Sequence, residues 1–99
     1  MLLKVNVRFF AALRELVGKK IEHLEFPDSE DVTVGRSLKQ LAERYGEGFV
    51  DFVFDRKTGD IRSYLTLLVN GRSIATLNEL ETKLVDGDVL AILPPVSGG

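Results

Sequence analysis

The chain ends in a run of residues that could carry an acyl group: Pro94, Pro95, Val96, Ser97, Gly98 and Gly99. Neither glycine has a Cβ, so the last two residues can enter a narrow active site and adopt dihedral angles closed to other residues. The two prolines hold the approach nearly extended, which lowers the entropy lost on insertion into a partner. At roughly 3.1–3.5 Å per residue, this run reaches about 20 Å. We therefore predict an extended tail over residues 94–99 whose working group is the terminal carboxyl of Gly99.

Few other groups in the chain could take part in chemistry. It contains no cysteine, which excludes thiolate nucleophiles, disulfides and cysteine metal sites. His23, the only histidine, alternates with Leu24 and Phe26, so we expect it on the exposed face of a strand rather than in a catalytic pair. A main-chain carboxylate has a pKa of about 3.5 and is an unreactive anion at neutral pH. The acyl chemistry of the tail therefore requires activation.

Two acidic motifs are better explained as turns than as metal sites. Asp86 and Asp88 flank a glycine, a spacing typical of a turn rather than of an acid pair. The stretch 55–60 begins and ends with aspartate, but Arg56 and Lys57 occupy the interior positions where a calcium loop needs acidic ligands. We predict no metal site and no cofactor bound by the chain itself.

The elements that must position the tail follow from hydrophobic periodicity and breaker residues. Residues 3–9 alternate between apolar and polar types, as in a strand with one buried face. Thr33 is a favourable N-cap, and the apolar residues that follow it share one helical face. The predicted elements are a strand over 3–9, a short helix over 10–17 closed by Gly18, a strand over 21–26, the main helix over 33–45, a strand over 64–69, a hairpin through Asn70-Gly71 into 72–74, and a buried strand over 89–93.

This order favours an α+β fold of the ubiquitin-like β-grasp type. One helix packed across one face of a small mixed sheet is an economical way to bury such single-sided elements. We expect the first two strands to be antiparallel neighbours joined across the short helix. The domain is predicted to cover residues 1–93, with the tail over residues 94–99.

Charge and hydropathy narrow the range of partners. The 13 basic and 15 acidic residues give a net charge of −2, so no cationic field attracts phosphate backbones and nucleic acid is not expected as a partner. No apolar stretch approaches the roughly 20 residues needed to cross a bilayer, so no membrane partner is expected. Lys4, Asn6 and Arg8 interrupt the first apolar residues, unlike a signal peptide. We expect a cytoplasmic location.

Two motifs at opposite ends of the chain resemble a known family. The run 84–99 reads L-V-D-G-D-V-L-A-I-L-P-P-V-S-G-G, and the run 9–18 reads F-F-A-A-L-R-E-L-V-G. They are similar to the L-x-D-G-D-x-V/L-A-x-x-P-P-V-x-G-G ending and the F-A-x-L-R-E-x-x-G segment of MoaD, the small sulfur-carrier subunit of molybdopterin synthase. Thr33-Val34 and the run 68–71 complete a resemblance that covers nearly the whole chain.

The resemblance implies a carrier subunit that is not an enzyme by itself. A ubiquitin-activating-type (MoeB-like) adenylyltransferase, using ATP and magnesium, would adenylate the carboxyl of Gly99. A persulfide-derived sulfur would then replace AMP and leave a thiocarboxylate. The large subunit (MoaE-like) would hold the pterin and receive the sulfur for dithiolene formation in the molybdenum or tungsten cofactor. Residues 94–98 would insert into the partner, and Leu93, with Val96, would contribute to docking.

One departure and two alternatives remain. Residues 47–63 form a longer connection than compact members of the family need, so we interpret them as an added hairpin-like segment or edge cover, with the run 49–54 as core, edge cover or a partner surface. A protein modifier joined to lysines through Gly99 would use the same tail. The thiazole sulfur carrier ThiS also ends in Gly-Gly, but it is shorter and lacks the Pro-Pro-Val approach.

Overall fold

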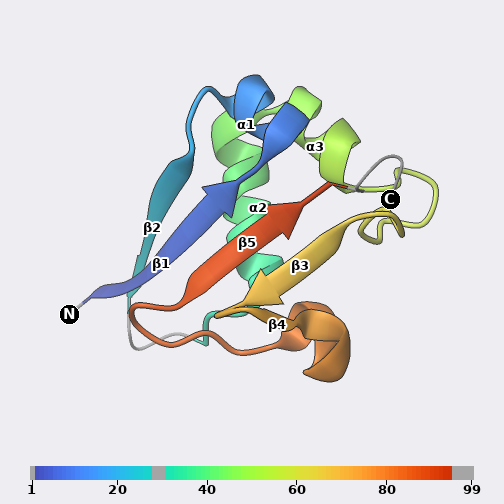
Figure 1. Cartoon of the computed structure of the whole chain (residues 1–99). Coiled ribbons are helices and arrows are strands. Elements are labelled where there is room, and N and C mark those ends of the chain that lie inside the picture. Colours follow the sequence, from blue (N-terminus) through green and yellow to red (C-terminus); the bar gives the residue numbers. More distant parts are fainter. Residues whose placement is uncertain (1, 28–30, 95–99) are drawn as a thin grey trace.

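The computed structural model describes residues 2–27 and 31–94. Within them the chain forms five strands, three α-helices and two short 3₁₀ helices (Figure 1). Their bounds are β1 Leu2–Phe9, α1 Ala11–Val17, β2 Ile21–Pro27, α2 Val34–Tyr45, α3 Glu47–Val53, β3 Thr66–Val69, β4 Arg72–Ser73, η1 Ile74–Thr76, η2 Glu79–Glu81 and β5 Val89–Leu93.

The strands form one mixed sheet in the order β2-β1-β5-β3-β4. β1 and β5 lie side by side as a parallel pair, and the other neighbours are antiparallel. Helix α2 crosses one face of this sheet, and the described part of the chain places no helix on the opposite face (Figure 1). This arrangement is the β-grasp fold, so the predicted fold class is confirmed. Among the described residues, no helix is long and apolar enough to cross a bilayer.

The first hairpin-like unit forms as the sequence predicts. β1 and β2 pair antiparallel, from Leu2 opposite Pro27 to Arg8 opposite Ile21, and α1 connects them. Gly18 closes α1 with a φ of 78°, a left-handed conformation that glycine adopts without a Cβ penalty, and its N–H donates to Arg14 O. The polar face of β1 therefore meets the polar face of β2 on the side of the sheet away from α2.

The core lies between the sheet and α2. Alternate residues of β1 and β5 point into it, and Val5, Val7, Leu90 and Ile92 are all 0% exposed. At the start of α2, Thr33 Oγ1 accepts a hydrogen bond from Arg36 N at 3.1 Å, which confirms the predicted N-cap.

Residues 47–63 are only partly as expected, because their first part is a helix. Phe49 and Val53 lie four residues apart on one face of α3, and both are 0% exposed. This confirms that the segment contributes to the core. The second part is hairpin-like: Phe54 and Ile61 form an isolated antiparallel bridge, and Arg62 N donates to Val53 O at 2.8 Å.

Candidate functional site: the base of the tail and the open sheet face

The tail starts from the centre of the sheet. Strand β5 lies between β1 and β3, and its last residue, Leu93, is opposite Thr66 of β3. Pro94 directly follows the strand and is partly buried. The other predicted tail residues lie outside the described part of the chain, so their roles stay predictions: Pro95, Val96, Ser97, Gly98 and Gly99.

The turn before β5 holds this strand in register. Asp86 Oδ1 accepts from Lys4 N at 2.7 Å, and Gly87 N donates to Lys4 O at 2.8 Å. Asp88 Oδ1 accepts from Asn70 Nδ2 at 2.9 Å, while its Oδ2 accepts from Val85 N at 2.8 Å. Both carboxylates thus satisfy backbone and amide donors, which confirms the predicted turn.

The second acidic motif is also a turn. Asp55 Oδ1 accepts from Lys57 N at 2.8 Å, and Asp55 O accepts from Gly59 N at 2.7 Å. Across residues 2–27 and 31–94, no group of three histidine, cysteine, aspartate or glutamate side chains could hold a metal ion.

His23 is an exposed strand residue, as predicted. It lies opposite Asn6 in the β1–β2 register, and its Nδ1 is 2.7 Å from Asn6 Oδ1. Position 23 alternates with the buried residues Leu24 and Phe26. The imidazole therefore lies on the face of the sheet away from α2.

A partly exposed apolar strip runs along this open face toward the tail. It consists of Val89, Ala91 and Leu93 of β5 with Leu68 of β3, and we call it the open-face strip. All four side chains are partly buried and alternate with the buried residues of their strands. Leu68 lies opposite Ala91 in the register. The predicted docking residue Leu93 thus belongs to a larger apolar surface that leads to the tail.

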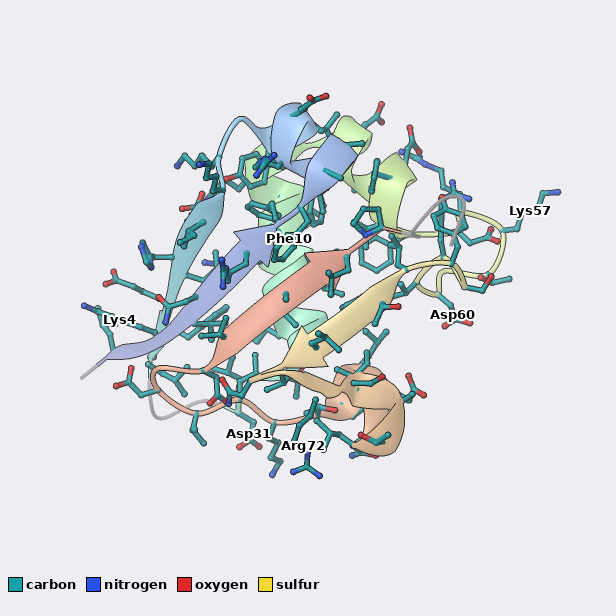
Figure 2. The ribbon with its side chains drawn as sticks, viewed as in Figure 1. Lys4, Phe10, Asp31, Lys57, Asp60 and Arg72 are labelled. Carbon is teal, nitrogen blue, oxygen red and sulfur yellow. The ribbon has the colours of Figure 1, made fainter. Side chains whose placement is uncertain are left out.

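An aromatic residue extends this surface at the end of β1. Arg8 lies beside Ala91 in the parallel register, and its guanidinium carbon is 5.6 Å from the centroid of the Phe10 ring. Phe10 is partly exposed and immediately follows β1 (Figure 2). Sequence reasoning missed Phe10, Ala91 and Leu68 as docking candidates. The alternation of β3 and β5 was the signal that could have found the last two.

A buried glutamate, Glu22, connects the edge strand β2 to helix α2. Glu22 of β2 is 6% exposed, and its Oε2 accepts from Tyr45 OH at 2.5 Å. The same oxygen lies 3.2 Å from Arg44 Nη1 and 3.3 Å from Lys19 Nζ. Its Oε1 accepts from the backbone N–H of His23 at 3.1 Å. These contacts tie the C-terminal end of α2 to the edge strand of the sheet.

The network shifts the pKa values of both central groups. Burial raises the pKa of Glu22, but hydrogen bonds from Tyr45, Arg44, the His23 N–H and Lys19 outweigh burial and lower it from 4.5 to about 2. Burial, followed by the bond to Glu22 and its charge, raises the pKa of Tyr45 from 10.0 to about 12, against the opposing charge of Arg44. Glu22 is therefore an ionised structural group at neutral pH.

Comparison with known proteins places this fold in a family. The sequence model of the ThiS family matches residues 7–99. The chain belongs to the ThiS family. Small archaeal modifier protein 3 of Haloferax volcanii is 35% identical over 97 residues, which cover 98% of this chain and 100% of that protein. The molybdopterin synthase sulfur carrier subunit of Drosophila yakuba is 33% identical over 95 residues, covering 96% and 90%.

A solved structure of a similar protein supports the same fold. The solution structure of small archaeal modifier protein 1 from Methanosarcina acetivorans superposes with a TM-score of 0.80 at 31% identity, covering 100% of this chain and 99% of that one. The names of these relatives divide between protein modifiers and a molybdopterin synthase subunit. The likeness therefore establishes a ubiquitin-like protein of the sulfur-carrier family and does not single out one acceptor.

Proposed function

We propose that this chain is the sulfur carrier subunit of a molybdopterin synthase, and that it presents a thiocarboxylate on Gly99 for dithiolene formation. The observation that carries the proposal is the position of β5. This strand is held between β1 and β3 and passes directly into Pro94 beside the open-face strip. A rigid base with a slim tail suits delivery of one reactive group into a partner's active site.

The proposed chemistry is catalysed outside the chain. A MoeB-like adenylyltransferase joins the carboxylate of Gly99 to the α-phosphate of ATP, with magnesium, and releases pyrophosphate. The outer sulfur of a partner's persulfide then displaces AMP to form an acyl disulfide, and a second thiol of the partner cleaves its S–S bond, which releases the thiocarboxylate and leaves a disulfide on the partner. The chain would therefore contribute the acyl group, and its partners the catalysis.

Docking to a MoaE-like large subunit would use the open-face strip. Leu93, Ala91 and Leu68 are partly exposed and lie beside the base of the tail. Covering such a surface removes apolar area from water, which contributes a favourable free energy of about 25 cal/mol per Å² buried. The tail, from Pro94 through Pro95, Val96, Ser97 and Gly98, would enter the large subunit and place Gly99 against the pterin. Each dithiolene has two sulfurs, so two carriers or two rounds would serve each pterin.

Protein modification is the second candidate function. The archaeal modifier protein aligns with this chain over its whole length at 35% identity. This similarity favours a modifier function, in which Gly99 is joined to lysines of other proteins. The same activation of Gly99 would precede either outcome. The two functions differ in the nucleophile that attacks the activated carboxyl of Gly99, which is a sulfur in the carrier and a lysine amine in the modifier.

Mass spectrometry of the N-terminally tagged chain, recovered from its own cells under denaturing conditions, tests both candidates. A free chain with sulfur in place of one terminal oxygen supports the carrier function. Adducts that link Gly99 to lysines of other proteins would move the main function to modification. A chain with an unmodified carboxylate in cells that make the cofactor would contradict the proposal.

Deleting Gly99 should abolish sulfur loading and leave the fold intact. The new terminal carboxylate would lie about 3.5 Å short of the activating centre. A misplacement of this size should slow adenylation by at least about 100-fold. Pyrophosphate release with the purified adenylyltransferase measures the effect, and Lys57→Ala in the exposed turn is the control that should load normally. Normal cofactor production by the truncated chain would contradict the mechanism.

A further inference from the structure

Two adjoining hollows lie beyond β3, on the side of the molecule where the loop after α3 and the coil of η1 and η2 both project (Figure 1). The first has a volume of about 340 Å³ and the second about 490 Å³, and both are lined by Ile61 and Glu79. We call the second hollow the acidic groove. Its lining residues are Asp60, Ile61, Asn78, Glu79, Leu80 and Glu81.

The rim of the acidic groove carries three negatively charged side chains. Asp60, Glu79 and Glu81 are exposed, and none of their carboxylates forms an ion pair with the residues in 2–27 and 31–94. The neighbouring hollow adds one cation, Arg62, whose Nε already donates to Asp51 O at 2.8 Å. Asp60 lies on the loop between α3 and β3 (Figure 2). Three carboxylates therefore share this surface without cationic partners among the described residues.

The floor of the groove is apolar. Ile61 and Leu80 are partly buried and pack against the core. The bridge between Ile61 and Phe54 holds one side of the floor. On the other side, a Cβ built on Gly35 would lie 3.2 Å from Leu80 O, so η2 sits closely against the first turn of α2.

Hydrogen bonds fix the shape of η2 before any partner arrives. Asn78 N donates to Thr82 Oγ1 at 3.0 Å, and Asn78 O accepts from Glu81 N at 3.0 Å. Glu79 O accepts from Thr82 N at 3.1 Å. A preformed surface loses little conformational entropy on binding, so even a small contact area can contribute affinity.

We propose that the acidic groove docks a basic, partly apolar segment of a partner protein. The aliphatic stem of a lysine or arginine would lie on Ile61 and Leu80, and its charged head would reach the carboxylates of the rim. Phosphate-bearing surfaces are disfavoured, because the rim repels nucleic acid backbones and anionic lipid headgroups. The inference goes beyond the proposed function and does not depend on the chemistry of Gly99.

The position of the groove would let this contact help to deliver the tail to the partner. The first hollow is lined by Leu65 and Thr66, and Thr66 lies opposite Leu93 at the base of the tail. A partner held at the groove would contact the domain next to the hollow that reaches the base of the tail, and outside the open-face strip. Two separate contacts raise the effective concentration of the tail at the partner's active site.

An NMR titration of the full ¹⁵N-labelled chain tests the proposal. The probe is the blocked peptide Gly-Lys-Ile-Arg-Leu-Gly, with one control peptide carrying glutamate for both cations and another carrying serine for both apolar residues. We expect saturable amide shifts concentrated at positions 60–61 and 78–81, with affinity that falls as salt increases. Both control peptides should shift these amides at least about 10-fold less at equal concentration.

Charge reversal in the chain gives the matched comparison. The pair Glu79→Lys and Glu81→Lys should weaken binding at least about 10-fold. The pair Glu15→Lys and Glu43→Lys changes the net charge equally but lies on α1 and α2, so it should weaken binding less than about twofold. Unchanged amide shifts in the sheet verify the fold of each variant. Absence of saturable shifts, shifts spread over the whole surface, or equal weakening by both pairs would overturn the proposal, whatever the state of Gly99.

Discussion

The two faces of the sheet use the same strands in opposite ways. On the face covered by α2, Leu90 and Ile92 of β5 are 0% exposed and pack in the core. On the open face, Val89, Ala91 and Leu93 of the same strand remain partly exposed. Because strand side chains alternate, the residues that stabilise the fold and those available for recognition are interleaved along one strand. Either face can therefore be changed while the other is kept.

Charged groups show the same difference between the faces. On the open face, Lys4 and Glu25 approach to 4.0 Å with both side chains more than half exposed. Such a pair contributes little to stability because solvent screens it. On the covered side, the Glu22 side chain is 8% exposed, and its carboxylate accepts from four donors. A glutamate therefore stabilises the fold on the covered side and contributes little to stability on the open face.

The largest effect should come from a cavity on the covered face. Leu90→Ala would remove a fully buried side chain in the middle of the sheet and leave a void that its neighbours cannot fill. We expect a loss of about 3 kcal/mol in the free energy of unfolding. Urea denaturation followed by circular dichroism measures it, with Ala91→Ser on the open face as the control. A loss below about 1 kcal/mol would mean that the core collapses around the site.

The next effect should be an acid-dependent loss of stability through Glu22. The pKa of Glu22 is lowered by folding, so its contribution is present above the unfolded pKa of 4.5 and is lost as pH falls toward the folded pKa of about 2. At about 1.4 kcal/mol per pKa unit, the full contribution is about 3 kcal/mol, of which a part is lost by pH 3. The measurement is the free energy of unfolding between pH 7 and pH 2.5.

Two variants separate Glu22 from general acid effects. Glu22→Gln should lower stability at neutral pH by about 2 kcal/mol and flatten the acid limb of the profile. Glu25→Gln removes the exposed partner of Lys4 and should change stability by less than about 0.5 kcal/mol at every pH. If both variants gave the same profile, the buried network would have no special role.

Much of the fold was predictable because it depends on local signals that agree with each other. The alternation in 3–9 set one face of β1, Thr33 marked the start of α2, and Asp86-Gly87-Asp88 marked the turn into β5. Helix α3 was missed because its Phe-Val-Asp-Phe-Val stretch is rich in β-formers and begins near Gly48. Burial of Phe49 and Val53 against the core overrides that local preference.

The site was less predictable because its parts meet only in three dimensions. Leu93 could be named from its place before the prolines, whereas Leu68 joins it only through the pairing of β3 with β5. The partners of Glu22 come from the loop after α1, from β2 and from α2, and no spacing rule connects residues 22 and 45. The tail motif was readable from sequence because it is contiguous.

The smallest stability effect, together with a large effect on binding, is expected on the open face. Leu68→Ser and Leu93→Ser remove partly exposed side chains that lie outside the core, so each should change the free energy of unfolding by less than about 1 kcal/mol. If the open-face strip docks the large subunit, each should weaken that complex by about 10- to 100-fold. Isothermal titration calorimetry with the purified subunit measures the affinity.

The matched control for this test is Tyr64→Ser, because Tyr64 is 51% exposed and lies outside the open-face strip. It removes a larger apolar side chain, so a general loss of surface hydrophobicity would affect it at least as much as Leu68→Ser. Docking by the strip requires that Tyr64→Ser bind normally while the two leucine variants do not. Equal weakening by all three would remove the distinction between the strip and the rest of the surface. If all three variants bound as tightly as the unchanged chain, the tail alone would account for recognition by the large subunit. The open face of the sheet would then differ from the covered face only in the burial of its side chains.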